Sequence, residues 1–200
     1  MARYTGPKDR LSRTEGVDLF GKGVKLTRLN IPPGVHGPKG TRKKQSQYGK
    51  QLREKQKVKR MYGILEKQFK GYITSALNTK GNTPDTLFSA LERRLDNVVY
   101  RLGFATTRAQ ARQLVSHRHV YVDGNRINIP SYQVKVGQTI TLSKKAMDMG
   151  EVRKLIKDKD FKVSDWLVRK AAAGNIKRVP KRDDVLEPIE DQDIIEYYSR

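Results

Sequence analysis

The stretch from Thr107 to Gly124, TRAQARQLVSHRHVYVDG, places three arginines beside a short apolar segment that ends in Asp-Gly. Arg108 and Arg112 are one helical turn apart and would project together, and Arg118 follows where a helix would give way to a strand. Guanidinium groups bind phosphate through forked hydrogen bonds and stack on bases. These arginines predict one positive ridge that contacts nucleic acid. The alternative is that each is only a solvent-exposed charge.

His117 and His119 stand two residues apart in the same stretch and could ligate a metal. No third ligand is evident nearby, so exposed histidines beside a phosphate contact are the favoured interpretation. Asp183 and Asp184 are paired carboxylates in a charge-rich stretch, where a solvated face is the commoner explanation. The chain has no cysteine, which excludes disulfides and thiolate catalysis, and no nucleotide-binding or zinc-protease motif. The sequence thus indicates no catalysis, no metal and no cofactor.

The overall charge points to a polyanionic partner. The chain carries 42 Lys and Arg against 21 Asp and Glu, a formal net charge of +21. Phosphates compensate such a surplus favourably because binding releases their counterions. An anionic membrane is the rival, but we find no broad amphipathic face, lipidation signal or membrane-length apolar run. RNA fits better than DNA because the basic helix would lead at once into a hairpin, which constrains its approach to a major groove.

The charge is distributed unevenly along the chain. Residues 1–60 contain 17 Lys and Arg and 4 Asp and Glu, whereas residues 183–200 contain 7 acidic residues and one arginine. Residues 1–47, rich in Gly, Pro and basic residues, predict a loosely structured arm that a polyanion would order. A flexible tail is the plainer alternative. The apolar residues near the C-terminus need cover, so we expect that tail to pack back on the body.

Helical periodicity is clearest in three segments. Residues 48–62 and 65–77 have apolar residues at helical spacing. Recurring leucines then predict one continuous helix that starts at Thr83 as N-cap, has Pro84 in its first position and stops at Gly103. One face of this helix should be buried.

The next segment predicts a helix, a hairpin and a strand. Thr107 and Gln110 form a capping-box pattern, and the Asp-Gly at 123–124 between alternating apolar residues is a strong hairpin signal. Apolar residues over 134–142 suggest a further strand. Residues 144–182 are ambiguous, with a short helix or linker followed by two strand-like segments.

Residues 93–140, from RRLDNVVYRL to YQVKVGQTI, resemble the RNA-binding module named after small-subunit ribosomal protein S-four. This module also occurs in pseudouridine synthases and tyrosyl-tRNA synthetases, so alone it implies only that the chain binds structured RNA. Four N-terminal segments resemble the ribosomal family itself in order and spacing: ARYTGPK, LSRTEG, PPGVHGP and QYGKQLREKQKVKRMYGILEKQF. With the terminal IIEYYSR, the resemblance covers nearly the whole chain.

This resemblance to the bacterial-type S-four family implies a structural, non-catalytic protein of the small ribosomal subunit. It would be a primary binder of 16S rRNA that nucleates assembly of the 30S body and contributes to the mRNA entry channel and translational accuracy. Its neighbours would be the third and fifth small-subunit proteins, and it could repress its own operon by binding that mRNA. The implied location is the cytoplasm, with a plastid ribosome as the alternative.

The chain departs from the family pattern at two places. Some members hold zinc through four N-terminal cysteines, whereas Asp9 and Ser12 occupy what look like the first two of those positions here. The zinc-free form is therefore implied, ordered by its own helices and by RNA. Many copies of the module have glycine where this chain has Arg118, which adds a phosphate ligand.

The implied fold class is α+β. A helical rRNA-binding domain with its extended basic arm would occupy residues 1–90, the helix-helix-hairpin module 91–155, and further strands with the acidic tail 156–200. On the module, the side chains predicted to bind RNA are Arg93, Arg94, Arg108, Arg112, His117 and Arg118. In the front half they are Arg42, Lys43, Lys44, Arg53, Lys57 and Arg60.

Other functions stay open on the sequence. The module could guide an RNA-modifying enzyme of the pseudouridine synthase type, although residues 144–200 look too short and too charged for its catalytic domain. A ribosome-associated RNA-binding factor could use the same module, and a sequence-specific DNA regulator is a further rival. Competition between rRNA fragments and duplex DNA would separate the last of these.

Overall fold

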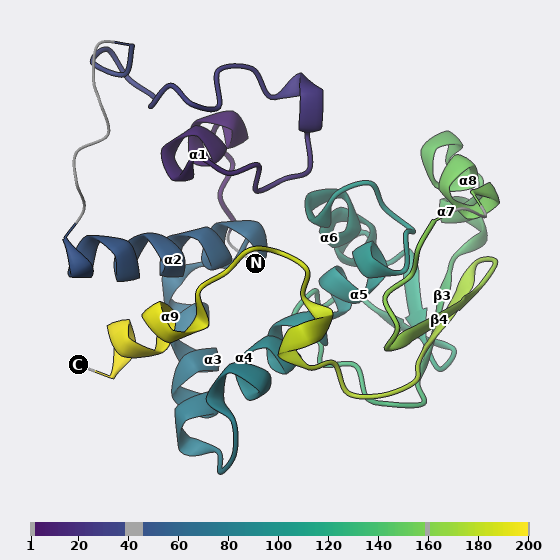
Figure 1. The fold of residues 1–200 in the computed structure, drawn as a ribbon. Coiled ribbons are helices and arrows are strands. Elements are labelled where there is room, and N and C mark those ends of the chain that lie inside the picture. The colour runs from purple at the N-terminus through teal and green to yellow at the C-terminus, as the bar shows by residue number, and fades with distance from the viewer. Residues whose placement is uncertain (1–2, 39–45, 159–160, 200) are drawn as a thin grey trace. The chain divides into compact units, whose positions relative to one another are not determined.

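The computed structural model describes residues 3–38, 46–158 and 161–199. Helices and one antiparallel sheet make the fold α+β, as predicted (Figure 1). The chain forms two compact units, Met1–Asn78 with Glu187–Arg200, and Thr79–Leu186. Residues 79–90 belong to the second unit, and residues 187–200 belong to the first. No helix in the described stretches is long and apolar enough to cross a membrane.

The first unit is helical. Its elements are α1 (Lys8–Glu15), the 3-10 helix η1 (Gly23–Lys25), α2 (Gln47–Met61), α3 (Glu66–Asn78) and α9 (Asp191–Tyr198). The helices expected over 48–62 and 65–77 are confirmed as α2 and α3. The expectation of a loose N-terminal arm is wrong for residues 8–15, which form α1, and Leu19 and Leu26 beyond it are buried.

The last helix of the chain, α9, packs along α2, and Figure 1 shows the two side by side. Ile194 of α9 is fully buried. Gln51 Nε2 of α2 donates to Glu196 Oε2 at 2.7 Å, and the rings of Tyr48 and Tyr197 lie 5.7 Å apart. Packing of α9 on α2 thus shields apolar C-terminal residues such as Ile194 from solvent.

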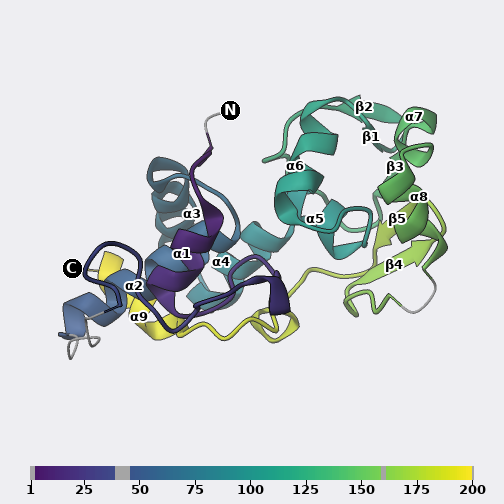
Figure 2. The same ribbon diagram turned by 90° about the horizontal axis from the view of Figure 1, so that it is seen from above.

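The second unit combines helices with a sheet. Its helices are α4 (Thr83–Glu92), α5 (Leu95–Arg101), α6 (Arg108–Ser116), α7 (Lys144–Met147), α8 (Gly150–Lys157) and the 3-10 helix η2 (Arg182–Asp184). Its strands are β1 (Val120–Val122), β2 (Asn125–Ile127), β3 (Thr139–Leu142), β4 (Leu167–Lys170) and β5 (Ala173–Ile176). The strands pair antiparallel in the order β2-β1-β3-β5-β4, and Figure 2 shows α5 and α6 on one side of them.

The prediction of one continuous helix over 83–103 is wrong, because the helix is interrupted between α4 and α5. A segment far along the chain pairs with the backbone at the break. Val134 N donates to Arg93 O at 2.9 Å, and Leu95 N donates to Tyr132 O at 2.9 Å. These bonds satisfy backbone groups that a continuous helix would have bonded internally.

The starts of α4 and α6 differ slightly from prediction. Asn82 rather than Thr83 is the N-cap of α4. Thr107 caps α6 as predicted, because its hydroxyl accepts from Gln110 N at 3.2 Å. The side chain of Gln110, however, accepts from Thr106 N at 2.8 Å and so does not close the expected capping box.

The hairpin predicted at the Asp-Gly pair is confirmed. Asp123 and Gly124 have φ of 49° and 80°, the positive values that a type I′ turn requires, and they join β1 to β2. The Asp123 carboxylate also accepts from Thr139 N at 2.8 Å, which fixes the turn against β3.

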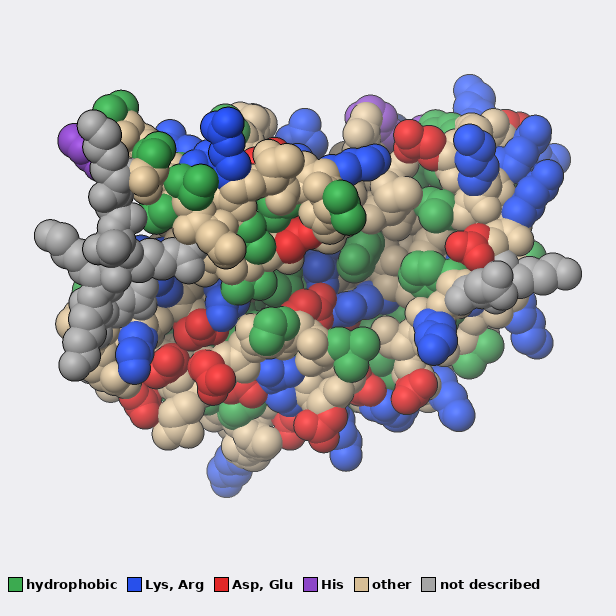
Figure 3. All heavy atoms as spheres, turned by 45° about the horizontal axis from the view of Figure 1, so that its top comes forward, with side chains coloured by type: hydrophobic (Ala, Val, Ile, Leu, Met, Phe, Trp, Pro, Cys, Tyr) green, Lys and Arg blue, Asp and Glu red, His purple; other side chains and the backbone are tan. Residues whose placement is uncertain are grey.

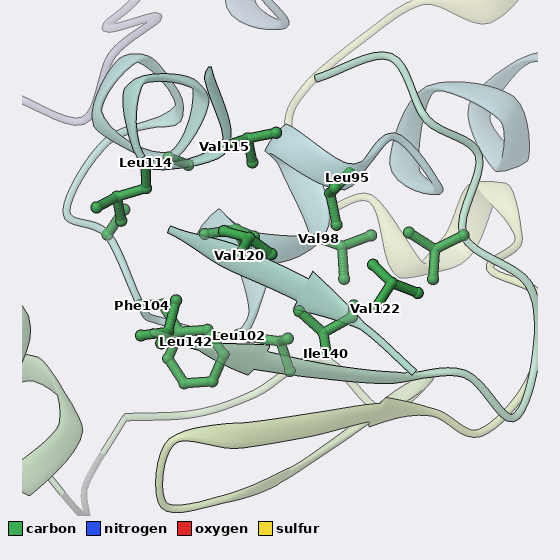
Figure 4. Packing of buried hydrophobic residues seen from close by; sticks show 14 of the residues in the cluster. Leu95, Val98, Leu102, Phe104, Leu114, Val115, Val120, Val122, Ile140 and Leu142 are labelled. Carbon is green, nitrogen blue, oxygen red and sulfur yellow. The ribbon is translucent and has the colours of Figure 1, made fainter. Parts of the chain in front are cut away.

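One hydrophobic cluster joins α5, α6 and the sheet. Figure 4 shows side chains from these elements converging: Leu95, Val98, Leu102, Phe104, Leu114, Val115, Val120, Val122, Ile140 and Leu142. Burial of large apolar side chains contributes roughly 1.5–3 kcal/mol each. This core therefore sets how α6 and the hairpin lie relative to each other.

Candidate nucleic-acid interface

Arg108 begins α6, and two side chains of α5 hold it. Its Nε donates to Asn97 Oδ1 at 2.9 Å, and its guanidinium lies 4.7 Å from the centre of the Tyr100 ring. Asn97 is oriented in turn, because its Nδ2 donates to Oε2 of the buried Glu92 at 2.8 Å. The result is a half-buried, pre-oriented cation suited to a phosphate or a base.

Arg94 and Arg112 lie inside the module rather than on its surface. Arg94 is fully buried, and its Nε and Nη2 donate to Asp96 at 3.1 and 2.7 Å. Arg112 is 7% exposed, and its Nη1 lies 3.9 Å from the same carboxylate. A buried guanidinium requires a carboxylate partner, and Asp96 serves both. The ridge expected from Arg108, Arg112 and Arg118 is therefore not present as one exposed feature.

The other predicted residues of the module divide between interior and surface. Arg93 is half-buried, and its Nε donates to Val134 O at 2.9 Å, which secures the break between α4 and α5. His117 and Arg118 are exposed where α6 gives way to β1. Arg118 has a φ of 63°, a left-handed conformation that costs a non-glycine residue about 1–3 kcal/mol. Glycine would adopt this conformation at lower cost.

A cleft of about 670 Å³ opens beside Arg118. It is formed by the end of α6, the three strands β1 to β3 and the start of α7. The residues that line it are His117, Arg118, His119, Tyr121, Gly124, Arg126, Thr141, Leu142, Ser143, Lys144, Lys145 and Met147. Three of these cations, Arg126, Lys144 and Lys145, were missed by sequence reasoning. Only the pairing of the strands brings them beside Arg118, although the hairpin register itself could have placed Arg126 opposite Tyr121.

His117 and His119 belong to no group of side chains placed to hold a metal ion in the described part of the chain. The rings of His117 and His119 are 6.4 Å apart, and His119 Nδ1 lies 3.1 Å from Ser143 Oγ. Across the described stretches, no group of three or more His, Cys, Asp or Glu side chains is arranged to hold a metal ion. Asp184, one of the paired carboxylates, lies 2.6 Å from Arg178 in an ion pair.

The predicted cations of α2 contact carboxylates of their own unit. Arg60 forms an ion pair with Glu15, and Arg53 lies 3.7 Å from the same side chain. Lys57 forms an ion pair with Glu54. Burial raises the pKa of Glu15, against the opposing charges of Arg60 and Arg53. The two Glu15 contacts join α1 to α2, and all three cations are engaged by carboxylates of their own unit.

Other cations of the first unit are better exposed. Outside the described residues lie Arg42, Lys43 and Lys44. The exposed cations that sequence reasoning left out include Arg10, Lys25, Arg28 and Lys50. The basic composition of the N-terminal segment could have indicated them. Figure 3 shows that Lys and Arg side chains are spread over the visible surface with carboxylates among them.

A polar cluster attaches α9 to α2 and α3. Glu66 accepts from Lys55 Nζ at 2.9 Å, from Lys59 Nζ at 2.8 Å and from the Tyr198 hydroxyl at 2.7 Å. Lys55 Nζ also lies 4.5 Å from the centre of the Tyr197 ring. Burial alone would raise the pKa of Glu66, but the three hydrogen bonds outweigh it and lower the pKa to about 2. Two lysines of α2 are thus engaged within the unit.

Exchange of Glu66 for glutamine should lower the free energy of unfolding by about 1 kcal/mol near neutral pH, a modest value because the side chain is 46% exposed. The pKa of Glu66 is lower in the folded chain than its ordinary 4.5, so its stabilisation is present above pH 4.5 and is lost as the pH falls toward 2. Urea denaturation of both proteins near pH 7 and near pH 3 measures this. A stability difference of equal size at both pH values would contradict the assignment.

Two family models and several full-length relatives match the chain. The family model "Ribosomal protein S4/S9 N-terminal domain" matches residues 3–92, and the model "S4 domain" matches residues 93–140. The protein named small ribosomal subunit protein uS4 is 49% identical in Trichlorobacter lovleyi, 47% in Parabacteroides distasonis and 48% in Chloroflexus aurantiacus. Each alignment covers 100% of both chains. The helical N-terminal unit, the helix-hairpin module and this full-length identity show that the chain belongs to the uS4 family of small ribosomal subunit proteins.

Proposed function

We propose that this chain is a structural, non-catalytic protein of the small ribosomal subunit and that it binds 16S rRNA. The observation that carries the proposal is identity near one half, over the whole of both chains, to proteins named for that subunit. The charge of the chain supports it, since phosphates compensate a surplus of +21. Both units expose cations, so each can contribute to an RNA interface.

The same proposal includes a role in assembly. The chain would bind 16S rRNA early, nucleate the 30S body, and lie beside the third and fifth small-subunit proteins near the mRNA entry channel, where it would affect translational accuracy. It would act in the cytoplasm, or in a plastid if the ribosome is of that origin. Repression of its own operon through the mRNA is a further part of the proposal. The resemblance of the chain to its family supports these points.

Sedimentation of a cell extract in high salt tests the ribosomal role. We expect the protein to travel with the small subunit and to be released by ribonuclease. A protein that sediments apart from ribosomal particles, with or without ribonuclease, would refute the proposal. Chemical cross-linking of the intact subunit should join the chain to the third and fifth proteins.

An RNA-modifying enzyme is not favoured, because the relatives that align over their full length are named as ribosomal proteins. Incubation of the purified chain with uridine-containing RNA should therefore yield no isomerised uridine. Isomerisation that depends on this chain would reopen the enzymatic alternative.

Arg108 allows a direct test of the RNA interface. Exchange for glutamine removes one charge and should reduce the log–log salt slope of rRNA binding by roughly 0.7–0.9, if one phosphate contact is lost. Exchange for lysine keeps the charge and should keep the slope, although it loses the bond to Asn97. Filter binding at several salt concentrations measures both variants. Equal slopes for the chain, its glutamine variant and its lysine variant would show that Arg108 does not contact phosphate.

A further inference from the structure

The fixed charges that line the cleft beside the hairpin are all positive. Four of its lining residues, Arg118, Arg126, Lys144 and Lys145, carry a positive charge, and none of the lining residues that the structure describes is Asp or Glu. Like charges that meet in one concave site repel each other, and the nearby low-dielectric protein strengthens that repulsion. An anion in the cleft would relieve it.

Local bonds position these cations without any ligand. Arg126 stands opposite Tyr121 in the hairpin, donates to its hydroxyl at 2.9 Å and places its guanidinium 5.4 Å from the ring centre. Ser143 caps α7 by accepting from Ala146 N at 3.2 Å, which orients the helix that carries both lysines. Arg118 holds a left-handed backbone that glycine would adopt at lower cost, which indicates a role for its side chain.

His119 lies among these charges. Its Nδ1 is 3.1 Å from Ser143 Oγ. The charges of His117 just after α6, Arg126 of β2 and Lys145 of α7 act on its ring. Burial lowers the pKa of His119 most, and these three neighbours lower it further. Burial and these neighbouring charges therefore favour the neutral imidazole in the free chain. A negative charge in the cleft would favour its protonated form.

We propose that this cleft is a phosphate site for the RNA backbone, and that His119 takes up a proton when a phosphodiester binds there. The lysines and arginines supply fixed charge, and the imidazolium adds one further charge and donor next to the bound group. Affinity for RNA should accordingly rise as the pH falls from about 8 to about 6. The inference rests on the proposed function, because rRNA is the polyanion that would supply the phosphodiester.

The first test compares two double variants of the full chain for binding to a 16S rRNA fragment. Lys144→Gln with Lys145→Gln should weaken binding about tenfold and reduce the log–log salt slope by roughly 1.4–1.8, twice the value for one phosphate contact. The matched control is Lys154→Gln with Lys157→Gln, the same charge change on α8 outside the cleft. The control should leave affinity and slope nearly unchanged. Circular dichroism verifies that all proteins are folded.

The second test varies pH at fixed ionic strength. Between about pH 8 and pH 6 the unchanged chain should gain about three- to tenfold in affinity. A rise of about one unit in the pKa of His119 on RNA binding limits the gain to about tenfold. His119→Gln should remove this gain and keep the fold. Titration of the histidine ring signals by NMR should show a higher pKa for His119 in the RNA complex than in the free chain.

The outcomes separate the two proposals. Failure of the unchanged chain to bind the rRNA fragment would refute the proposed function itself. Binding with equal behaviour of the cleft and control variants, or a pH gain that survives His119→Gln, would overturn only the phosphate site. Inorganic phosphate provides a further arm: a His119 response to phosphate alone, without any response to RNA, would also overturn the assignment to the RNA backbone.

Discussion

Replacement of Asp96 by alanine should lower the free energy of unfolding by about 3–5 kcal/mol, the range for a buried ion pair that loses one partner. Arg94 is fully buried, and its Nε and Nη2 both donate to the Asp96 carboxylate. Arg112 lies 3.9 Å from the same group. The substitution would thus leave two guanidinium groups inside the module without their carboxylate. Urea denaturation followed by circular dichroism measures the loss.

The matched control for Asp96 is Asp148→Ala. Asp148 pairs with Arg153 at 3.2 Å, but the two side chains are 71% and 59% exposed. An exposed ion pair contributes about 0–1 kcal/mol, so the control should lower stability only slightly. Similar small losses for both substitutions would show that the Asp96 cluster is not a buried structural network.

Ile194→Ala should be the second large effect, with a loss of about 2–5 kcal/mol in the stability of the first unit. Ile194 is fully buried where α9 packs on α2, and the shorter side chain leaves a cavity there. Hydrogen exchange of α2 amides should speed up, whereas amides of β1 to β3 in the second unit should not change.

The neighbouring Ile195 offers a control of identical chemistry. Ile195 lies on the same helix but is only partly buried, so Ile195→Ala should cost clearly less than Ile194→Ala. Equal effects at the two positions, or faster exchange throughout both units, would contradict the proposed docking of α9.

Elements with local signals were predictable from sequence. The Asp-Gly pair before β2 has the two positive φ values of its turn type, and α2 and α3 lie within one residue of their expected limits. The break between α4 and α5 was not predictable, since the leucine spacing continues across it. At the break, Arg93 bonds Val134, which lies forty-one residues later in the chain. No local pattern encodes a pairing of that range.

For the candidate RNA interface, too, the sequence predicted some features and missed others. The surplus of cations and the family resemblance determined an RNA-binding protein from the sequence alone. Periodicity placed Arg108 and Arg112 on one helical face, but it could not show that Asp96 turns Arg112 inward. Glu15 likewise contacts Arg60 from the preceding helix in sequence, forty-five residues away.

The sequence by itself determined the kind of partner, because net charge and local motifs do not depend on how the chain folds. The tertiary structure alone decided which cations face that partner. A guanidinium or ammonium group that is buried with a carboxylate is less available to RNA, and such burial arises from long-range packing. That packing buries Arg94 with Asp96 and gathers Arg118, Arg126 and Lys145 around one open cleft.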